Sequence, residues 1–376
     1  MSKIILAPDK FKHTLSATEI CRIETEEILK LIPEAEVVSF PMADGGEGTL
    51  DLLTSTIGLD QVMVEVSDPL FRPIMGRYGI SKDGQNAYIE MALASGLDLL
   101  SPQERNPMLT SSFGTGQLIA HAMDAGVQKV HLFIGGSATN EGGMGMASAL
   151  GFRFYDEQGR QLTGSGQELS RVHSWDGDGV HHRLPHTQFV VATDVKNILL
   201  GEQGATYTFG AQKGGSIDQL RLLEEGMVNF AEQSTRQMEQ SYASVPGAGA
   251  AGGLGYGALA FLGAEIRSGI DLLIEVTGLA DALVETQLII SGEGNLDEQS
   301  TQGKVVDGIG RLAKSKNVPF GVICGGLELS DEQLSAANIS LHKSLVEVSG
   351  SLEAALKEPE RYLRQATRQF ILDWLQ

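Results

Sequence analysis

The stretch KIILAPDKFKHTLSATEICRIETEEILKLIPEAEVVSF, residues 3–40, decides the fold class of this chain. It opens with a short apolar run, Lys3–Ala7, which is typical of a buried parallel strand. Ser16-Ala17-Thr18-Glu19 then has the S-x-x-E form of a capping box and predicts the start of a helix. A second apolar strand, Glu36–Phe40, follows this helix. Strand, helix and strand in this order predict an α/β fold.

The pattern changes after residue 60. Gln61–Val66 and Ile74–Ile80 read as strands, and Asp83-Gly84 is a hairpin signal before a further strand at Ala87–Met91. We therefore expect a small antiparallel patch here. Ser216 and Gln219 form a second capping-box pair, which predicts a long helix. Strand and helix alternate again around the apolar runs at 129–134, 188–192, 288–290 and 319–324.

Length and charge limit the class of protein. A chain of 376 residues is long for one core, so two domains are expected, with three as the alternative. The net charge of −20 argues against a nucleic-acid partner or an anionic membrane. Only Cys21 and Cys324 are present, without a CxxC pair, which favours a reducing cytoplasm. No apolar run approaches about 18 residues, so we expect no membrane-spanning segment.

Four loops combine glycines with acids, hydroxyls or amides. They are ADGGEG (43–48), GGSATNEGG (135–143), PGAGAAGGLG (246–255) and SGEGNLDEQSTQGK (291–304). Glycine lets backbone N–H groups turn toward an anion, and carboxylates can hold Mg²⁺ or take a proton from a hydroxyl. Together these parts suit phosphoryl transfer, where catalysis is mostly positioning and charge neutralisation.

The positions of the special residues matter as much as their types. Each of Asp9, Asp44, Gly135, Asp194 and Glu293 comes just after an apparent strand. In open α/β sheets, ligands bind beyond the carboxyl ends of the strands. We therefore expect one crevice to collect all five.

The segments that follow the first two predicted strands offer acids and cations. Asp9 is followed by Lys10 and Lys12, which can act as point charges for a carboxylate or phosphate. Asp44 is a candidate metal ligand or general base, with Glu47 in support. Gly45 and Gly46 lie between these two acids and are candidates for substrate binding.

The loop at 135–143 is a candidate anion site. Gly135 and Gly136 lead toward a helix start, where backbone N–H groups favour anions. Ser137, Thr139 and Asn140 add side-chain donors. A close strand–helix crossing that requires glycine is the alternative explanation.

Two further positions have open roles. Asp194 follows the strand Gln188–Ala192 and is either a metal ligand or a cap. Lys213, in FGAQKGG, either neutralises a phosphate or is a surface lysine.

The last two glycine loops resemble nucleotide motifs only in part. Gly249 and Gly252 belong to a literal G-x-G-x-x-G at 247–252, but Pro246 and a polar stretch precede it instead of a strand. Phosphate contact is therefore favoured over a dinucleotide fingerprint. Glu293, Asp297 and Lys304 form a cluster of acids and one lysine that does not match a P-loop.

Read in order, the motifs closely resemble the bacterial type 1 glycerate kinases over nearly the whole chain. The matching segments are APDKFKHTLSA (7–17), ADGGEGT (43–49), IEMALASGL (89–97), GTGQLI (114–119), GGSATNEGG (135–143), TDVKN (193–197), FGAQKG (209–214), PGAGAAGGLG (246–255) and SGEGNLDEQSTQGK (291–304). The resemblance implies phosphorylation of D-glycerate by ATP with Mg²⁺, mostly at the 2-hydroxyl. Glu141 stands where an Asp is common.

The resemblance also implies two α/β domains. A flavodoxin-like domain would comprise residues 1–75 plus 288–376, and a second α/β domain, residues 76–287, would be inserted in it. The site would lie in the cleft between the domains. A homodimer is left open.

On this interpretation Lys10 and Lys12 hold the glycerate carboxylate, with Lys10 also catalytic. Asp44 accepts the hydroxyl proton, or holds Mg²⁺ if Asp194 is the base, and Glu293 is a further metal candidate. The loops at 135–143 and 246–255, with Lys213 and Lys304, bind ATP. Phosphorylation at the 3-hydroxyl, a nicotinamide-dependent dehydrogenase and a glycerate-sensing regulator remain alternatives.

Overall fold

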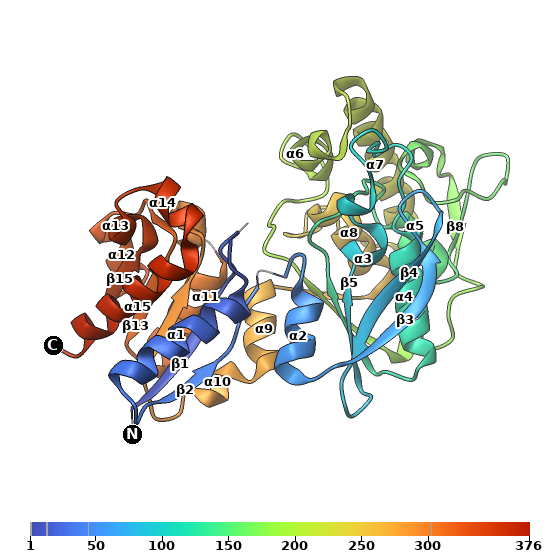
Figure 1. Cartoon of the computed structure of the whole chain (residues 1–376). Helices are drawn as coiled ribbons and strands as arrows, with labels where there is room; N and C mark the ends of the chain where they lie inside the picture. Colours follow the sequence, from blue (N-terminus) through green and yellow to red (C-terminus); the bar gives the residue numbers. More distant parts are fainter. Residues whose placement is uncertain (1, 13, 44, 302) are drawn as a thin grey trace. The chain divides into compact units, whose positions relative to one another are not determined.

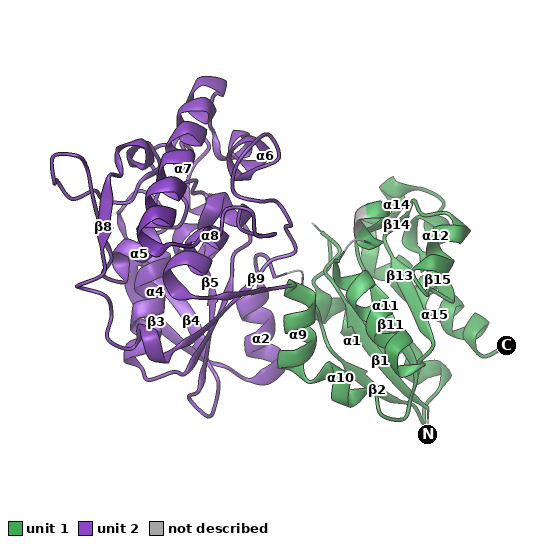
Figure 2. Cartoon of the chain, turned by 180° about the vertical axis from the view of Figure 1, so that it is seen from behind, with its two compact units in different colours: residues 1–44, 268–376 green, residues 45–267 purple. Residues whose placement is uncertain are grey.

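The computed structural model describes residues 2–12, 14–43, 45–301 and 303–376. The chain separates into two compact units, coloured in Figure 2. Unit 1 comprises residues 1–44 and 268–376, and unit 2 comprises residues 45–267. Both chain ends therefore build unit 1. The junctions of these units differ from the expected 75/76 and 287/288: residues 45–75 group with unit 2, and residues 268–287 group with unit 1.

Unit 1 is built on a parallel sheet in the order β15-β13-β11-β1-β2. Numbered along the chain within the unit, this order is 2-1-3-4-5, which is the flavodoxin-like arrangement. The predicted strands at both chain ends are confirmed. They are β1 (Lys3–Pro8), β2 (Glu36–Ser39), β11 (Thr286–Gly292) and β13 (Phe320–Cys324). The remaining strand of this sheet is β15 (Leu341–Ser344).

Helices cover this sheet, as Figure 1 shows. The predicted capping box starts α1 (Ala17–Leu31): the Glu19 N–H donates to Ser16 Oγ at 3.2 Å, and the Ser16 N–H donates to Glu19 Oε2 at 2.9 Å. Helix α1 packs against α15 (Pro359–Trp374). Helix α11 (Val305–Lys316) packs against α9 (Gly269–Thr277). The shorter elements are α10 (Leu279–Ala282), β12 (Asn295–Leu296), η5 (Glu298–Thr301), β14 (Gly326–Leu327), α12 (Asp331–Ala336), α13 (Leu345–Ser349) and α14 (Leu352–Lys357).

Unit 2 contains a larger sheet in the order β10-β9-β6-β5-β4-β3. The strands are β3 (Asp60–Ser67), β4 (Pro73–Ile80), β5 (Asn86–Glu90), β6 (Lys129–Phe133), β9 (Gln188–Ala192) and β10 (Glu265–Arg267). The first three are antiparallel, as expected, and the other pairs are parallel. The expected patch is therefore one edge of a mixed sheet, because β5 also pairs with β6.

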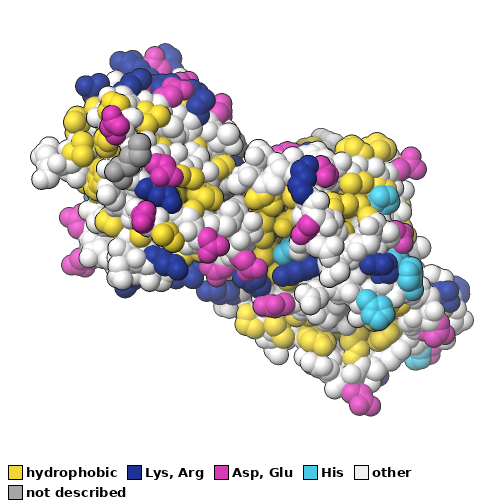
Figure 3. Space-filling model, turned by 90° about the horizontal axis from the view of Figure 1, so that it is seen from below, with side chains coloured by type: hydrophobic (Ala, Val, Ile, Leu, Met, Phe, Trp, Pro, Cys, Tyr) yellow, Lys and Arg dark blue, Asp and Glu magenta, His cyan; other side chains and the backbone are white. Residues whose placement is uncertain are grey.

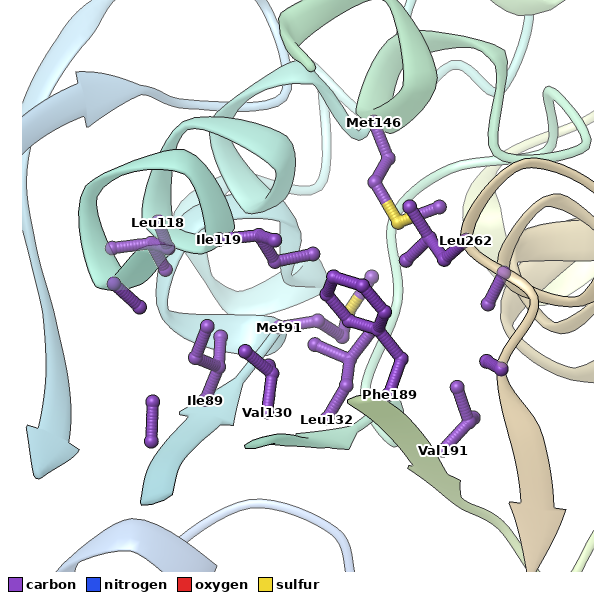
Figure 4. Close-up of a cluster of buried hydrophobic side chains, with 14 of the residues drawn as sticks. Ile89, Met91, Leu118, Ile119, Val130, Leu132, Met146, Phe189, Val191 and Leu262 are labelled. Atoms are coloured by element: carbon purple, nitrogen blue, oxygen red, sulfur yellow. The ribbon is translucent and has the colours of Figure 1, made fainter. Parts of the chain in front are cut away.

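The core of unit 2 lies between this sheet and three helices, α4 (Phe113–Asp124), α5 (Met144–Ala149) and α8 (Ala250–Leu262). Figure 4 shows Ile89, Val130 and Leu132 from the strands facing Leu118 and Ile119 of α4. Burying one such side chain fully is worth about 1.5–3 kcal/mol. This packing holds the strand ends, and the loops that follow them, in fixed positions.

The remaining elements of unit 2 surround this core. Helix α2 (Thr49–Ile57) contacts β4 and β5, and the predicted long helix α7 (Ile217–Met238) begins at the Ser216 capping box. The others are α3 (Ala92–Ser95), η1 (Leu97–Leu99), β7 (Arg153–Tyr155), η2 (Gly166–Arg171), β8 (Ser174–Asp176), η3 (Leu184–His186), α6 (Ala205–Phe209) and η4 (Ala211–Lys213).

Charged side chains of both signs are mixed on the surface. On the face in Figure 3, Lys and Arg lie among Asp and Glu. Many are paired; Arg364, for example, bonds to Glu26 and Glu360 at 2.8 and 2.7 Å. None of the helices in the described ranges combines the length and apolar character needed to cross a membrane.

Candidate active site

The glycine loops of unit 2 meet at the carboxyl end of β6. A Cβ on Gly135 would lie 2.7 Å from Gly46 Cα, so the loops at 45–48 and 135–143 touch through their backbones. The Gly142 N–H donates to Gly252 O at 3.1 Å, which joins the third loop. Three of the loops predicted from sequence thus lie together, because each needs the close backbone approach that glycine allows.

Lys213 lies beneath the loop at 135–143. Its Nζ donates to Ser137 Oγ at 2.8 Å and to Thr139 O at 2.6 Å. The side chain is only 2 % exposed. Lys213 is therefore not the surface lysine that the sequence left open, and it fixes the loop from inside.

Burial also changes the interpretation of the polar residues in this loop. Thr139, Asn140 and Glu141 are fully buried, and Ser137 is 8 % exposed, whereas Gly136 is exposed. The Asn140 amide donates to Thr206 Oγ1 at 3.1 Å. The expected direct contact of Thr139, Asn140 and Lys213 with a bound phosphate does not fit this burial. The surface available to a ligand is the backbone around Gly135 and Gly136.

Glu141 is the second ionisable group in this interior. The Gly145 N–H donates to its Oε2 at 2.5 Å, while no described residue hydrogen-bonds to its Oε1. Burial raises the pKa of Glu141 to about 7, against the lowering effect of this hydrogen bond. Burial also lowers the pKa of Lys213 to about 7, and attraction to Glu141 partly opposes this change. A buried acid and a buried base thus stand under one loop.

The loop at 45–48 is anchored by an acid from the sheet. Glu90, at the end of β5, accepts hydrogen bonds from the Gly48 N–H at 2.9 Å and the Leu50 N–H at 3.1 Å. These N–H groups belong to the start of α2, so a carboxylate of the protein already occupies the position where an anion would bind. Glu47 lies against Gly136. Asp44, the first candidate base, lies outside the described residues.

Asp194 follows β9, as expected, and the next residues support the third glycine loop. The N–H groups of Gly247 and Gly249 both donate to Asn197 O, at 3.2 and 2.9 Å. No strand in the described part of the chain runs directly into residues 247–252. The dinucleotide fingerprint is therefore not formed, which removes the structural basis of the dehydrogenase alternative.

The other candidates belong to unit 1. The Asp9 N–H donates to Gly292 O at 2.8 Å, which brings the loop of Asp9, Lys10 and Lys12 beside Glu293 at the ends of β1 and β11. Asp297 instead closes a turn, since its N–H donates to Ser300 Oγ at 3.0 Å. Lys304 is the N-cap residue of α11. The strand-end residues thus follow two different sheets, so their meeting in one crevice stays a prediction.

The acids of the predicted site suit a magnesium ion only if substrate phosphates supply further ligands. Across the described ranges, no three His, Cys, Asp or Glu side chains gather closely enough to hold a metal ion. Mg²⁺, however, is commonly bound by one or two carboxylates together with substrate phosphates. Asp194 and Glu293 therefore stay predicted ligands, each as a single carboxylate.

Sequence reasoning missed Glu90, Glu141 and the burial of Lys213. Glu90 lies in the IEMALASGL motif and Glu141 in the glycine loop at 135–143, so both belong to segments that the sequence had already singled out. An acid among apolar residues at the end of a strand was the available signal for Glu90. Nothing local shows that Lys213 turns inward.

Fold and loops together define an α/β protein with acid- and glycine-rich loops, several of them at the carboxyl ends of parallel strands, an arrangement that suits phosphoryl transfer. Comparison with known proteins narrows it. The model of the glycerate kinase family matches residues 4–375. The chain belongs to the glycerate kinase family, a family of phosphotransferases.

Individual relatives agree over nearly their whole length. A glycerate kinase of Halalkalibacterium halodurans is 39 % identical over 98 % of this chain and 97 % of its own. A glycerate 2-kinase of Escherichia coli K12 is 38 % identical over 97 % and 96 %. A crystal structure from Salmonella typhimurium LT2, described as a candidate glycerate kinase 2, has a TM-score of 0.88 at 38 % identity and covers 99 % of this chain and 98 % of its own.

Proposed function

We propose that this protein transfers the γ-phosphoryl group of ATP to the 2-hydroxyl of D-glycerate, giving 2-phosphoglycerate and ADP. The observation that carries the proposal is the family match over residues 4–375. The similarity to a glycerate 2-kinase over 97 % of the chain supports the 2-hydroxyl as acceptor. Two buried, unlinked thiols, Cys21 and Cys324, support a cytoplasmic location.

The reaction needs one proton acceptor. The glycerate oxygen forms a bond to the γ-phosphorus, the bond from this phosphorus to the β–γ bridging oxygen breaks, and ADP leaves with that electron pair. The hydroxyl proton passes to a carboxylate of the protein. Asp44 and Asp194 are the proposed acceptors.

The loops of unit 2 supply the nucleotide site in this proposal. Backbone groups around Gly135 and Gly136 face the phosphates, and Lys213 acts from beneath through its bonds to Ser137 and Thr139. Because it acts through other residues, Lys213 is a positioning residue. Gly249 and Gly252 hold the adjoining backbone.

The loops of unit 1 supply the acceptor site. Lys10 and Lys12 are exposed cations beside Asp9 and offer charge for the glycerate carboxylate. Mg²⁺, held by Asp194 or Glu293 together with the phosphates, supplies charge neutralisation when bound.

An ADP-release assay with D-glycerate tests the function. We expect ADP to form only when D-glycerate and ATP are both present. In the same assay, loss of the true base lowers kcat by about 10²-fold or more. Asp44→Asn and Asp194→Asn therefore separate the two candidates, and full activity in one of them removes that residue from the chemistry. No ADP from the unaltered protein would overturn the proposal.

A further inference from the structure

Because Lys213 is buried, it offers no cation at the surface of the loop at 135–143, where we propose that nucleotide phosphates bind. Phosphates and carboxylates bind best to cations that reach them directly. Lys213 does not reach the surface, because its ammonium is committed to Ser137 and Thr139 inside the protein. Arg105, a partly buried cation on a neighbouring segment, is the candidate for such a contact.

Arg105 lies on the segment between η1 and α4, against the residue that follows Lys213. A Cβ on Gly214 would lie 2.1 Å from Arg105 O and 3.0 Å from Arg105 Cβ. Further along the same segment, Thr110 Oγ1 donates to Ala138 O at 2.9 Å. The segment therefore runs along the loop at 135–143, and its arginine stands beside η4.

Among the residues that the structure describes, none forms an ion pair with the guanidinium of Arg105. No described residue accepts a hydrogen bond from its buried Nε. The adjacent acid, Glu104, is already taken, since it accepts from Arg72 Nη1 at 2.6 Å and from the Ser101 N–H at 3.0 Å. Carboxylates are abundant in this chain of net charge −20, yet the described ones leave Arg105, like Arg183, without an ion pair. A buried Nε–H group without a hydrogen bond costs free energy, and an anionic ligand that accepts this hydrogen bond would recover it.

We propose that Arg105 binds a substrate oxyanion beside the glycine loop, either a nucleotide phosphate or the glycerate carboxylate. The planar guanidinium offers parallel N–H donors that match either group. The inference rests on the proposed function for the identity of the substrates. The contact itself does not depend on turnover, because binding can be measured without it.

The experiment compares Arg105→Gln with Arg183→Gln. Arg183 is also a partly buried arginine whose Nε has no described partner, but it lies before β9, at the amino end of the strands, and donates to Gly126 O at 3.1 Å. KM for ATP and KM for D-glycerate are measured for each variant. Calorimetric titration with ATP alone gives Kd without catalysis.

For Arg105→Gln we expect one KM to rise by at least about 10-fold, the scale of a charged hydrogen bond. A change in KM and Kd for ATP assigns the phosphate, and a change confined to KM for D-glycerate assigns the carboxylate. Arg183→Gln should leave all three values unchanged. Values for Arg105→Gln within twofold of the unaltered protein would overturn the proposal.

Two further arms keep the test decisive. If Arg105→Gln does not fold, Arg105→Lys replaces it; we expect a smaller rise in the same KM, and values within twofold would again overturn the proposal. If the unaltered protein makes no ADP from D-glycerate, the proposed function fails, and the ATP titration of the variants still decides whether Arg105 binds phosphate.

Discussion

At the residue scale, the buried pair Lys213 and Glu141 distinguishes this site from an ordinary glycine loop. Lys213→Met removes the donor to Ser137 Oγ and Thr139 O and leaves Glu141 without its countercharge. Lys213 and Glu141 attract each other electrostatically, although no direct ion pair joins them among the described contacts. Removing one partner of a buried pair of opposite charges typically costs about 3–5 kcal/mol, whereas replacing both partners by neutral groups is often close to neutral. We therefore expect Lys213→Met to lower the free energy of unfolding in urea by about this amount. The double variant Lys213→Met/Glu141→Gln should recover most of it, and equal losses in the single and double variants would contradict the pairing.

The same pair predicts how stability depends on pH. Burial raises the pKa of Glu141 to about 7, from about 4.3 in an unfolded chain. Between these two pKa values the folded protein keeps a proton on Glu141 that the unfolded chain has lost. The free energy of unfolding therefore falls as pH rises through this range.

Lys213 acts in the opposite sense. Burial lowers its pKa to about 7, from about 10.4 unfolded. Above pH 7 the unfolded chain binds the extra proton, so the free energy of unfolding rises with pH. Relative to the double variant, the unaltered protein should thus have its lowest free energy of unfolding near pH 7. This free energy should be higher at pH 5 and at pH 9. Urea unfolding at the three pH values measures this, and a maximum at pH 7 would show that both groups stay charged.

At the element scale, α8 depends on glycine where it meets the loop at 135–143. Gly252 has φ of +66°, and a Cβ there would lie 1.9 Å from Thr139 O. Gly263, at the end of the same helix, has φ of +62° with nothing within 4 Å of its Cβ position.

Gly263→Ala should therefore cost only the backbone strain of a left-handed alanine, about 1 kcal/mol. Gly252→Ala adds the clash with Thr139 and should cost clearly more in urea unfolding, with loss of activity. Equal effects of the two substitutions would show that the contact between loop and helix is not maintained.

Local signals explain which elements were predictable. The capping boxes at Ser16 and Ser216 and the strand Gln188–Ala192 were predicted correctly because each depends on a few adjacent residues. The joining of the antiparallel patch to β6 was not predicted, because it depends on pairing between Asn86–Glu90 and Lys129–Phe133, far apart in sequence. The inward turn of Lys213 was missed for the same reason: its acceptors, Ser137 and Thr139, lie more than 70 residues away.

At the scale of the whole molecule, the acids and cations that we propose for the reaction are divided between the two units, in a chain of net charge −20. A strongly acidic protein needs cations to accept a nucleotide triphosphate, and Mg²⁺ supplies that charge in phosphoryl transfer. We expect EDTA to abolish turnover and added Mg²⁺ to restore it in the ADP-release assay. Undiminished turnover in EDTA would contradict a metal-dependent mechanism.

Identification of the product tests the central claim most directly. ³¹P NMR of the protein incubated with ATP, Mg²⁺ and D-glycerate measures the phosphate esters as ATP is consumed. Phosphoryl transfer to the 2-hydroxyl predicts one molecule of 2-phosphoglycerate for each ATP converted to ADP. Inorganic phosphate as the sole product, or no consumption of ATP, would contradict phosphoryl transfer to glycerate; 3-phosphoglycerate would contradict the assignment of the 2-hydroxyl.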